Sequence, residues 1–253
     1  GRGGSDTTAV AIACSSGLKS CEIYTDVDGI FTSDPRVVKS AVKIKNITYE
    51  EILELASLGS KVLHPRSVEL AMKYGIRVHV RSSFNRKSGT MVIKEENKIE
   101  KEVVTGITSS ENDAKITLKG IPDKPGIAAE IFGILASLNI NVDMIVQNIT
   151  DDGKFASLTF TVPVDDQGRA VKELKKSEIK FKKIHANNSI CKISIVGVGM
   201  KSNVGVAQKM FETLANKNIN IQVISTSEIK ISVLIDLKKK KIALNALHKA
   251  YGL

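Results

Sequence analysis

Two segments of this 253-residue chain are copies of one another. Residues 126–145 (GIAAEIFGILASLNINVDMI) and residues 205–224 (GVAQKMFETLANKNINIQVI) match at nine of twenty positions without a gap. Agreement over this length indicates an internal duplication, so we expect two small units that share one fold. No other feature of the sequence restricts the fold as strongly.

The two copies carry the same order of expected elements. Each has a strand, a glycine-containing loop, a helix, an Asn-rich turn, two more strands and a second helix. The first copy has strands at 115–120, 142–149 and 155–162 and helices at 127–138 and 171–176; the second has strands at 192–197, 221–225 and 230–235 and helices at 206–217 and 241–251. This order is typical of the βαββαβ, ferredoxin-like α+β unit. Units of about 70 residues bury little apolar surface alone, so we expect the two to pair side by side into a continuous sheet.

The first 95 residues follow a different pattern, in which helices and strands alternate. We expect helices over 7–13, 52–56 and 67–74 and strands over 21–25 and 76–80. Thr48 and Glu51 have the spacing of a capping box, and Gly75 has the position of a helix C-cap. This alternation predicts an α/β unit with a mostly parallel sheet, whose ligands bind at the carboxyl ends of the strands. A polar stretch over 94–102 follows, which gives domains at 1–95, 96–180 and 181–253.

Composition excludes several classes of function. The net charge is +10, but thirty of the 37 basic residues are Lys and only seven are Arg. The excess is spread along the chain, so we interpret it as a Lys-rich surface and expect no nucleic-acid partner. Three cysteines give neither a disulfide framework nor a zinc pattern, and we expect free thiols in a reducing cytoplasm. No run of 18 apolar residues occurs, so we expect no membrane partner.

Three motifs in the first unit combine residues that bind anions. Segment 1–8 (GRGGSDTT) places glycines, hydroxyls, a carboxylate and Arg2 before a helix, where backbone N–H groups attract an anion. Segment 25–36 (TDVDGIFTSDPR) gathers three carboxylates and an arginine after a strand, which suits Mg²⁺ or polyphosphate. In segment 59–65 (GSKVLHP), Lys61 is a candidate phosphate contact and His64 is expected to pack or to cap a helix. The alternatives are a tight turn for the first motif and a solvated turn for the second.

A fourth candidate site lies in the first copy of the repeat. The turn 123–126 (DKPG) precedes a helix, and Asn141, Asp143 and Gln147 lie nearby in the expected fold. Such a group can hold a zwitterion, with the helix start binding its carboxylate and Asp143 its ammonium. The alternative is a simple turn with a capped helix.

Together these segments resemble aspartate kinase. Segments 1–9, 25–36 and 59–65 look like the catalytic motifs of that family, and 123–126, 139–148 and 224–229 look like the effector-binding segments of its two ACT domains. The resemblance spans nearly the whole chain with the motifs in order. It implies part of an amino-acid-kinase fold followed by tandem ACT domains. In relatives one ACT unit is inserted within the other, so a strand over 103–108 can belong to the second unit.

The resemblance also implies a reaction. The family transfers the γ-phosphoryl group of ATP to the β-carboxylate of L-aspartate with Mg²⁺, the first step toward lysine, threonine and methionine. Positioning and charge neutralisation suffice for this chemistry. Asp6 matches the acid that organises the reacting groups, and aspartate would be bound by Arg2, Gly3, Gly4 and Ser5. The implied nucleotide contacts are Ser5, Thr25, Asp26, Phe31, Asp34, Arg36 and Lys61. Phe31 stands where relatives often have tyrosine.

One departure from the family pattern concerns activity. The family opens with a Lys-Phe-Gly-Gly segment whose lysine stabilises the transferred phosphoryl group, and this segment does not occur here. We therefore expect the chain to be part of a longer kinase and to be inactive alone. The alternative is a non-catalytic, amino-acid-sensing regulatory subunit of aspartate kinase, against which the motifs of the first unit argue.

The ACT pair implies feedback control by lysine, threonine or both. It also implies a homo-oligomer formed by ACT–ACT pairing, or an α2β2 assembly with a regulatory subunit. The second copy has Gln222 where the first has Asp143, so the first copy is the better site for an ammonium. The implied effector-binding residues are Asp123, Lys124, Gly126, Asn141, Val142, Asp143, Gln147, Ala207, Gln208, Ile221, Gln222, Glu228 and Ile229.

Overall fold

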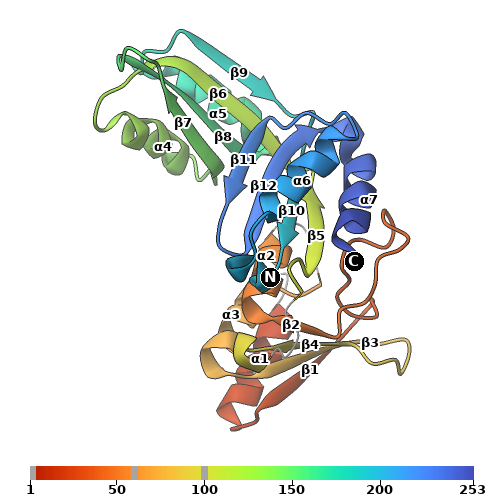
Figure 1. The fold of residues 1–253 in the computed structure, drawn as a ribbon. Coiled ribbons are helices and arrows are strands. Elements are labelled where there is room, and N and C mark those ends of the chain that lie inside the picture. The colour runs from red at the N-terminus through yellow and green to blue at the C-terminus, as the bar shows by residue number, and fades with distance from the viewer. Residues whose placement is uncertain (1–3, 58–61, 98–101) are drawn as a thin grey trace.

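The computed structural model describes residues 4–57, 62–97 and 102–253, which form three four-stranded sheets with their helices. Figure 1 shows an N-terminal unit at the bottom, the second repeat in the middle and the first repeat at the top. Of the residues expected to form sites, Arg2, Gly3 and Lys61 lie outside the described ones. No helix in the described part has the length and apolar content needed to cross a membrane.

The N-terminal unit alternates helices and strands as its sequence predicts. Its elements are α1 (Gly4–Ser15), β1 (Ser20–Thr25), β2 (Asn46–Thr48), α2 (Tyr49–Ser57), α3 (Pro65–Tyr74), β3 (Arg77–Ser82), β4 (Thr90–Ile93) and the 3-10 turn η1 (Glu95–Asn97). The sheet has the order β1-β3-β4-β2, in which β1 pairs parallel with β3 and β2 parallel with β4. The mostly parallel α/β expectation is confirmed; β2 and β4 are short strands that the sequence pattern did not predict.

Local capping explains where two of these helices begin and end. Glu51 N donates to Thr48 Oγ1 at 3.2 Å and Thr48 N donates to Glu51 Oε2 at 3.0 Å, which is the predicted capping box. His64 caps α3 by accepting from Arg66 N, and Gly75 ends it in the left-handed region with φ 66°. These contacts fix the start of α2 and both ends of α3.

The first repeat has the predicted βαββαβ order. It comprises β6 (Asp113–Pro122), α4 (Ile127–Ser137), β7 (Asp143–Ile149), β8 (Phe155–Pro163), the 3-10 turn η2 (Val164–Asp166), α5 (Gln167–Lys176) and β9 (Lys183–Asn187). The antiparallel sheet has the order β7-β8-β6-β9. Alternate residues of β6 and β8 pack against α4 and α5 around the fully buried Phe160 and Ile131.

The second repeat takes its fourth strand from an earlier part of the chain. It comprises β10 (Ile190–Val196), the 3-10 turn η3 (Val198–Ser202), α6 (Val206–Ala215), β11 (Val223–Thr226), β12 (Lys230–Asp236), the 3-10 turn η4 (Leu237–Lys239) and α7 (Lys240–Tyr251). β5 (Gly106–Ser110) pairs antiparallel with β10, so the sheet order is β11-β12-β10-β5. The first repeat is therefore inserted between two neighbouring strands of the second.

The duplication is visible in the backbone. Asn139 and Asn218, which lie at equivalent positions, both adopt left-handed conformations with φ 57° and 51° directly after α4 and α6. Asn tolerates this region better than most residues because its short polar side chain can bond locally. The Asn-rich turns of the sequence therefore end the first helix of each repeat in the same way.

The two repeats contact one another through β7 and β11, which lie side by side in Figure 1. Met144 of β7 packs in a small apolar cluster with Ile190, Val223 and Leu234 of the second repeat. Met144 has φ 46°, and the ladder between β7 and β8 shifts register between Asp143 and Val146. This bulge lies at the inter-repeat contact, where it alters the direction of the chain.

The backbone directly after β10 packs closely against the segment before β5. A Cβ added to Gly197 would lie 2.4 Å from Val103 O and 2.8 Å from the Cα of Val104. The φ of Gly197 is 177°, which any residue adopts, so the absence of a side chain matters here only for space.

We predict that Gly197→Ala lowers the free energy of unfolding by about 2 kcal/mol, because the new methyl group meets backbone that cannot move aside cheaply. Gly133→Ala is the matched control, since Gly133 is in α4 with nothing within 4 Å of an added Cβ. This control should raise the stability by up to about 1 kcal/mol through helix propensity. Urea denaturation of both variants measures the difference, and equal midpoints would contradict the steric interpretation.

Candidate functional site

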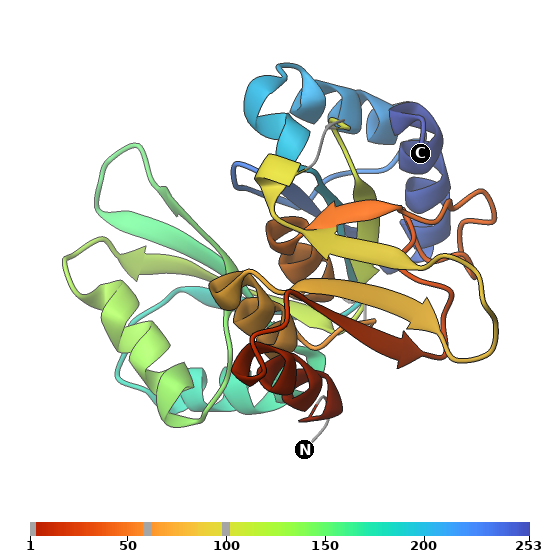
Figure 2. The same ribbon diagram turned by 90° about the horizontal axis from the view of Figure 1, so that it is seen from below.

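Four of the predicted first-unit residues lie at the start of α1 or at the end of β1 and directly after it. Only a short connection separates the end of α1 from the start of β1, and the two elements contact one another, so they run antiparallel (Figure 2). Ser5 and Asp6 in the first turn of α1 therefore lie toward the end of the sheet where Thr25 finishes β1 and Asp26 follows. Carboxyl ends of parallel strands are the usual ligand edge of such sheets.

Hydrogen bonds organise this edge. Thr25 Oγ1 donates to Asp26 Oδ1 at 3.1 Å, and Ser83 N, after β3, donates to Thr25 O at 2.8 Å. Ser5 Oγ donates to Asp6 Oδ1 at 3.3 Å, and His64 N donates to Asp6 Oδ2 at 3.4 Å. Asp6 thus connects the start of α1 to the start of α3. No group of three His, Cys, Asp or Glu side chains within the described residues could hold a metal ion by itself.

The other predicted nucleotide contacts lie farther along the loop. Phe31 pairs with Lys43 through a backbone bridge. Arg36 forms a fork with Asp34, with Nε 3.0 Å from Oδ1 and Nη2 2.9 Å from Oδ2. This pairing lowers the pKa of Asp34 and raises that of Arg36. The Arg36 side chain is 89% exposed and pairs with Asp34 rather than with Asp26.

Asp28 of the same loop was not a predicted site residue, and its surroundings give it a structural role. Its carboxylate accepts from Asn85 Nδ2 at 2.7 Å and from Lys87 Nζ at 3.2 Å. The Asn85 hydrogen bond and then the Lys87 interactions lower the pKa of Asp28. These contacts tie the start of the loop to the connection between β3 and β4.

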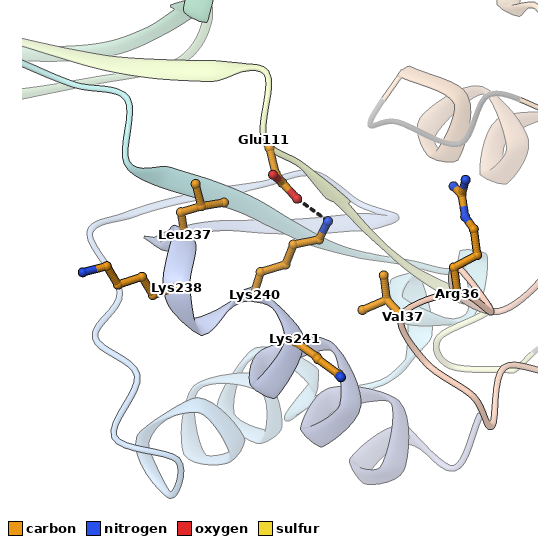
Figure 3. Close-up of a pocket in the computed structure, with 7 residues that line it drawn as sticks. All are labelled: Arg36, Val37, Glu111, Leu237, Lys238, Lys240 and Lys241. Atoms are coloured by element: carbon orange, nitrogen blue, oxygen red, sulfur yellow. Dashed lines mark hydrogen bonds and ion pairs between the residues drawn. The ribbon is translucent and has the colours of Figure 1, made fainter.

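A cavity of about 390 Å³ lies between the loop and α7. Figure 3 shows Arg36 and Val37 on one side of it and Lys238, Lys240 and Lys241 on the other. Lys240 is paired with Glu111, whereas the other cationic side chains point in different directions. The charges therefore do not converge on one bound anion.

In the first repeat, the structure brings two predicted effector residues together. Gln147 Nε2, on β7, lies 3.4 Å from Asp123 Oδ1 in the loop before α4. Gly126 opens that helix with φ 91°, a conformation that favours glycine. Lys124 is 3.7 Å from Glu130 in an exposed ion pair, and Asn141 and Val142 directly precede β7. Gly126 supplies no side-chain cap to α4, so N–H groups of its first turn contribute to this polar corner.

Asp143 is engaged by a residue that sequence reasoning missed. Lys192 Nζ, on β10, lies 2.9 Å from Asp143 Oδ2 and 3.3 Å from Asp113 Oδ1. Lys192 is 5% exposed, while the Asp143 side chain is 62% exposed. Burial alone would raise the pKa of Asp143, but the hydrogen bond and charge of Lys192 outweigh it and the pKa is lowered. Asp143 therefore remains a carboxylate at neutral pH with an accessible side.

A second cross-repeat contact mirrors the first. Lys115 Nζ, on β6, donates to Gln222 Oε1 at 2.6 Å, and burial lowers the pKa of Lys115. Gln222 is the repeat equivalent of Asp143, and Lys192 is that of Lys115, because the strands 115–120 and 192–197 correspond. Lysines at these two equivalent positions were visible in the sequence, and a two-fold pairing of the copies places each near position 143 or 222 of the other copy.

The remaining predicted residues of the second repeat do not converge. Gln208 Nε2 donates to Glu212 Oε1 within α6, next to Ala207. Ile229 O accepts from Gly197 N at 3.0 Å, in the turn that also holds Glu228. Ile221 precedes Gln222, whose N donates to Leu234 O. The first repeat thus carries the better-formed corner.

Comparisons with known proteins fit this division of the chain. Residues 1–82 match the amino acid kinase family, and residues 116–178 and 193–251 each match an ACT domain. An aspartate kinase of Stutzerimonas stutzeri is 48% identical over 256 residues, and an aspartokinase of Helicobacter pylori is 50% identical over 257 residues. Both alignments take in 100% of this chain but 62% and 63% of the relatives, so the chain spans less than two thirds of their length.

Solved structures give the same result. Escherichia coli aspartokinase III in complex with aspartate and ADP superposes with a TM-score of 0.82 at 29% identity, covering 99% of this chain and 56% of that one. A chain from a crystal structure of aspartokinase alpha and beta subunits is 48% identical with a TM-score of 0.56; the match covers 59% of this chain and 99% of that one. Nearly half of the aligned residues are shared over that whole relative, and the kinase and ACT matches divide the chain as its fold does, so the chain belongs to the aspartate kinase family.

Proposed function

We propose that this chain is part of a feedback-regulated aspartate kinase, which transfers the γ-phosphoryl group of ATP to the β-carboxylate of L-aspartate. The observation that carries the proposal is the identity of 48% to 50% with aspartokinases along the entire chain. It is supported by the antiparallel run of α1 and β1, which brings the start of α1, with Ser5 and Asp6, toward the end of the sheet that carries Thr25 and Asp26. The reaction would supply the first intermediate toward lysine, threonine and methionine.

In this proposal the N-terminal unit binds both substrates. Arg2, Gly3, Gly4 and Ser5 would hold aspartate at the start of α1, where N–H groups favour a carboxylate. The nucleotide would enter as its Mg²⁺ complex, with the metal bound mainly by phosphate and water oxygens. Asp6 would orient the reacting groups, and Lys61 and Arg36 would neutralise the phosphates. Catalysis then rests on positioning and charge neutralisation.

The two repeats would bind the effector, lysine or threonine, and would pair with other ACT units. The N–H groups at the start of α4 suit the carboxylate of an amino acid, and Asp143 suits its ammonium. Escherichia coli aspartokinase III has been solved with lysine and aspartate, which supports an effector of this class. Exposed Ile145 and Ile224, at equivalent positions on the edge strands β7 and β11, support assembly as a homo-oligomer or with a regulatory subunit.

A regulatory subunit without catalysis is the second candidate. The regulatory subunit of Thermus thermophilus aspartate kinase is 41% identical to this chain, and the match covers 98% of that protein but 58% of this one. The remaining residues include the sheet edge described above, which favours the kinase. Free cysteines at 14, 21 and 191 suit a reducing compartment, and we place the protein in the cytoplasm.

The proposed activity is testable in a chimera. Joining this chain to the part of the Helicobacter pylori aspartokinase that it does not cover should give an enzyme that releases ADP from MgATP only when L-aspartate is present. Asp6→Asn should lower kcat on the order of a hundredfold, because one oriented charge is lost from the transition state. Asp151→Asn, in an exposed turn of the first repeat, is the control. A folded chimera that releases no ADP with aspartate would refute the kinase assignment.

The 253-residue polypeptide alone should be inactive. It lacks the Lys-Phe-Gly-Gly segment, so no lysine from that segment reaches the transferred phosphoryl group. A coupled ADP-release assay with MgATP and L-aspartate should read no higher than the blank, with intact Helicobacter pylori aspartokinase as the positive control. Appreciable aspartyl phosphate from the polypeptide would contradict this expectation.

Effector binding depends on the charge of Asp143 in this proposal. Isothermal titration of the chain with L-lysine and with L-threonine should show binding of at least one, and Asp143→Ala should weaken it roughly tenfold to a hundredfold through loss of a charged hydrogen bond. Because the folded pKa of Asp143 is lowered, affinity should hold from pH 8 to pH 6 and fall only as acid protonates the carboxylate below its usual pKa. Unchanged binding in Asp143→Ala would refute the assignment.

A further inference from the structure

A segment of the N-terminal unit leaves its own sheet and packs on the second repeat. We call residues 32–42 the docked loop. Its stem is closed by the backbone bridge between Phe31 and Lys43 and by Thr32 N donating to Val42 O at 2.9 Å. Asp34 and Arg36, two of the expected nucleotide contacts, lie within it. The position of these two residues therefore depends on what holds the docked loop.

Apolar contacts insert the docked loop into the second repeat. Val38 is fully buried within the core cluster of that repeat, and Val37 and Ala41 pack against the same cluster. Ile107 N, on β5, donates to Thr32 O at 2.7 Å. Figure 3 shows Arg36 and Val37 of the docked loop beside α7.

One buried side chain of α7 binds both ends of the docked loop. His248 is 1% exposed; its Nε2 lies 2.9 Å from Thr32 Oγ1 and its Nδ1 lies 3.2 Å from Ser40 Oγ. Thr32 Oγ1 also accepts from Val42 N at 3.0 Å, so this hydroxyl belongs to the stem as well. A neutral imidazole donates at one nitrogen and accepts at the other, and hydroxyls adapt to either tautomer. The rigid ring thus sets the separation of the two hydroxyls.

The surroundings favour the neutral ring that this arrangement needs. Burial lowers the pKa of His248, because a charged imidazolium loses its hydration there. The same burial makes an unpaired ring nitrogen costly, so each hydroxyl contributes to holding the loop in place.

We propose that His248 is a positioning residue through which α7 of the second repeat sets the place of Asp34 and Arg36. This inference rests on the proposed function insofar as those two residues contact the nucleotide. That the His248 ring holds the docked loop in place does not depend on any kinase activity. A shift of α7 relative to the N-terminal unit would move the docked loop with it.

Hydrogen–deuterium exchange of the 253-residue chain, read by mass spectrometry, tests this positioning. Three substitutions separate the two bonds: His248→Gln keeps an amide near the Nε2 position, His248→Asn keeps one near the Nδ1 position, and His248→Leu keeps neither. His248→Leu should raise exchange of residues 32–42 on the order of tenfold while β6 and β8 of the first repeat remain as protected as in the wild type. His248→Gln should restore most of the protection through Thr32.

Two further variants cover the case in which His248→Leu fails to fold. Ser40→Ala removes the exposed hydroxyl and leaves α7 intact, and it should raise exchange in the docked loop alone. His185→Leu, at an exposed site on β9, is the matched control and should change nothing in the loop. Wild-type protection of residues 32–42 in folded His248→Leu, or in Ser40→Ala, would overturn the proposal. If His248→Gln raised hydrogen–deuterium exchange equally throughout the chain, the proposal would also be overturned, because His248 would then have a merely structural role.

The link between His248 and nucleotide binding is tested in the chimera described above. If the docked loop positions phosphate contacts, His248→Leu should raise the KM for MgATP more than it lowers kcat, and His248→Gln should restore the KM. An unchanged KM together with increased loop exchange would confine His248 to a structural role and overturn its link to the nucleotide. A chimera without any activity would refute the kinase proposal and leave the exchange result as it stands.

Discussion

The buried carboxylate of Glu51 holds the N-terminal unit to the second repeat. Its Oε2 accepts from Thr48 N within its own helix cap, while Oε1 accepts from Thr105 Oγ1 at 2.6 Å and from Val198 N at 3.0 Å. The side chain is fully buried, so protein groups must replace the water it gave up. The start of α2, the segment before β5 and the exit from β10 are thereby held in one arrangement.

The strand β10 connects this carboxylate with the contact between the repeats. Every residue from Ile190 to Val196 is buried, and Lys192 near one end reaches across to Asp143 while Val198 follows the other end. The docked loop adds a second attachment on the α7 side. The N-terminal unit is thus joined to the second repeat through Glu51 and through the docked loop. The first repeat is joined to the second through Lys192, through Lys115 and through the cluster around Met144. A ligand that changes the contact between Asp143 and Lys192 therefore acts on β10, and β10 leads to the Val198 N–H that donates to Glu51.

The sequence predicted those features in which a local pattern decides the structure. The capping box at Thr48, the cap at His64, the left-handed Gly75 and the Asn turns after α4 and α6 each depend on residues within one or two turns. The short strands β2, β4 and β9 were missed because three to five residues carry too little periodicity to be recognised. The contacts of Glu51 Oε1 could not be predicted, because its partners Thr105 and Val198 lie far along the chain.

Long-range contacts also explain what local patterns missed at the candidate sites. Asp143 is predicted to bind an ammonium group, and Lys192 of the other repeat already places one beside it. Arg36 and Asp26 are both predicted nucleotide contacts; Arg36 pairs with Asp34 in its own loop, and the burial of Val38 holds that loop against the second repeat. The contacts of Lys192 and Val38 join different units, so no local pattern reveals them. The corner formed by Asp123 and Gln147 was predictable because β7 and the loop before α4 are neighbours within one repeat.

The nested order of the two repeats has a further consequence. Ser110 at the end of β5 lies opposite Lys192 in β10, so the first repeat leaves and re-enters the second at adjacent points of one ladder. An insertion whose two ends meet in this way needs no strain to be accommodated, and the host sheet is closed whatever the inserted unit contains. The first repeat is therefore free to diverge in sequence, or to change shape, without breaking the sheet on which the N-terminal unit rests.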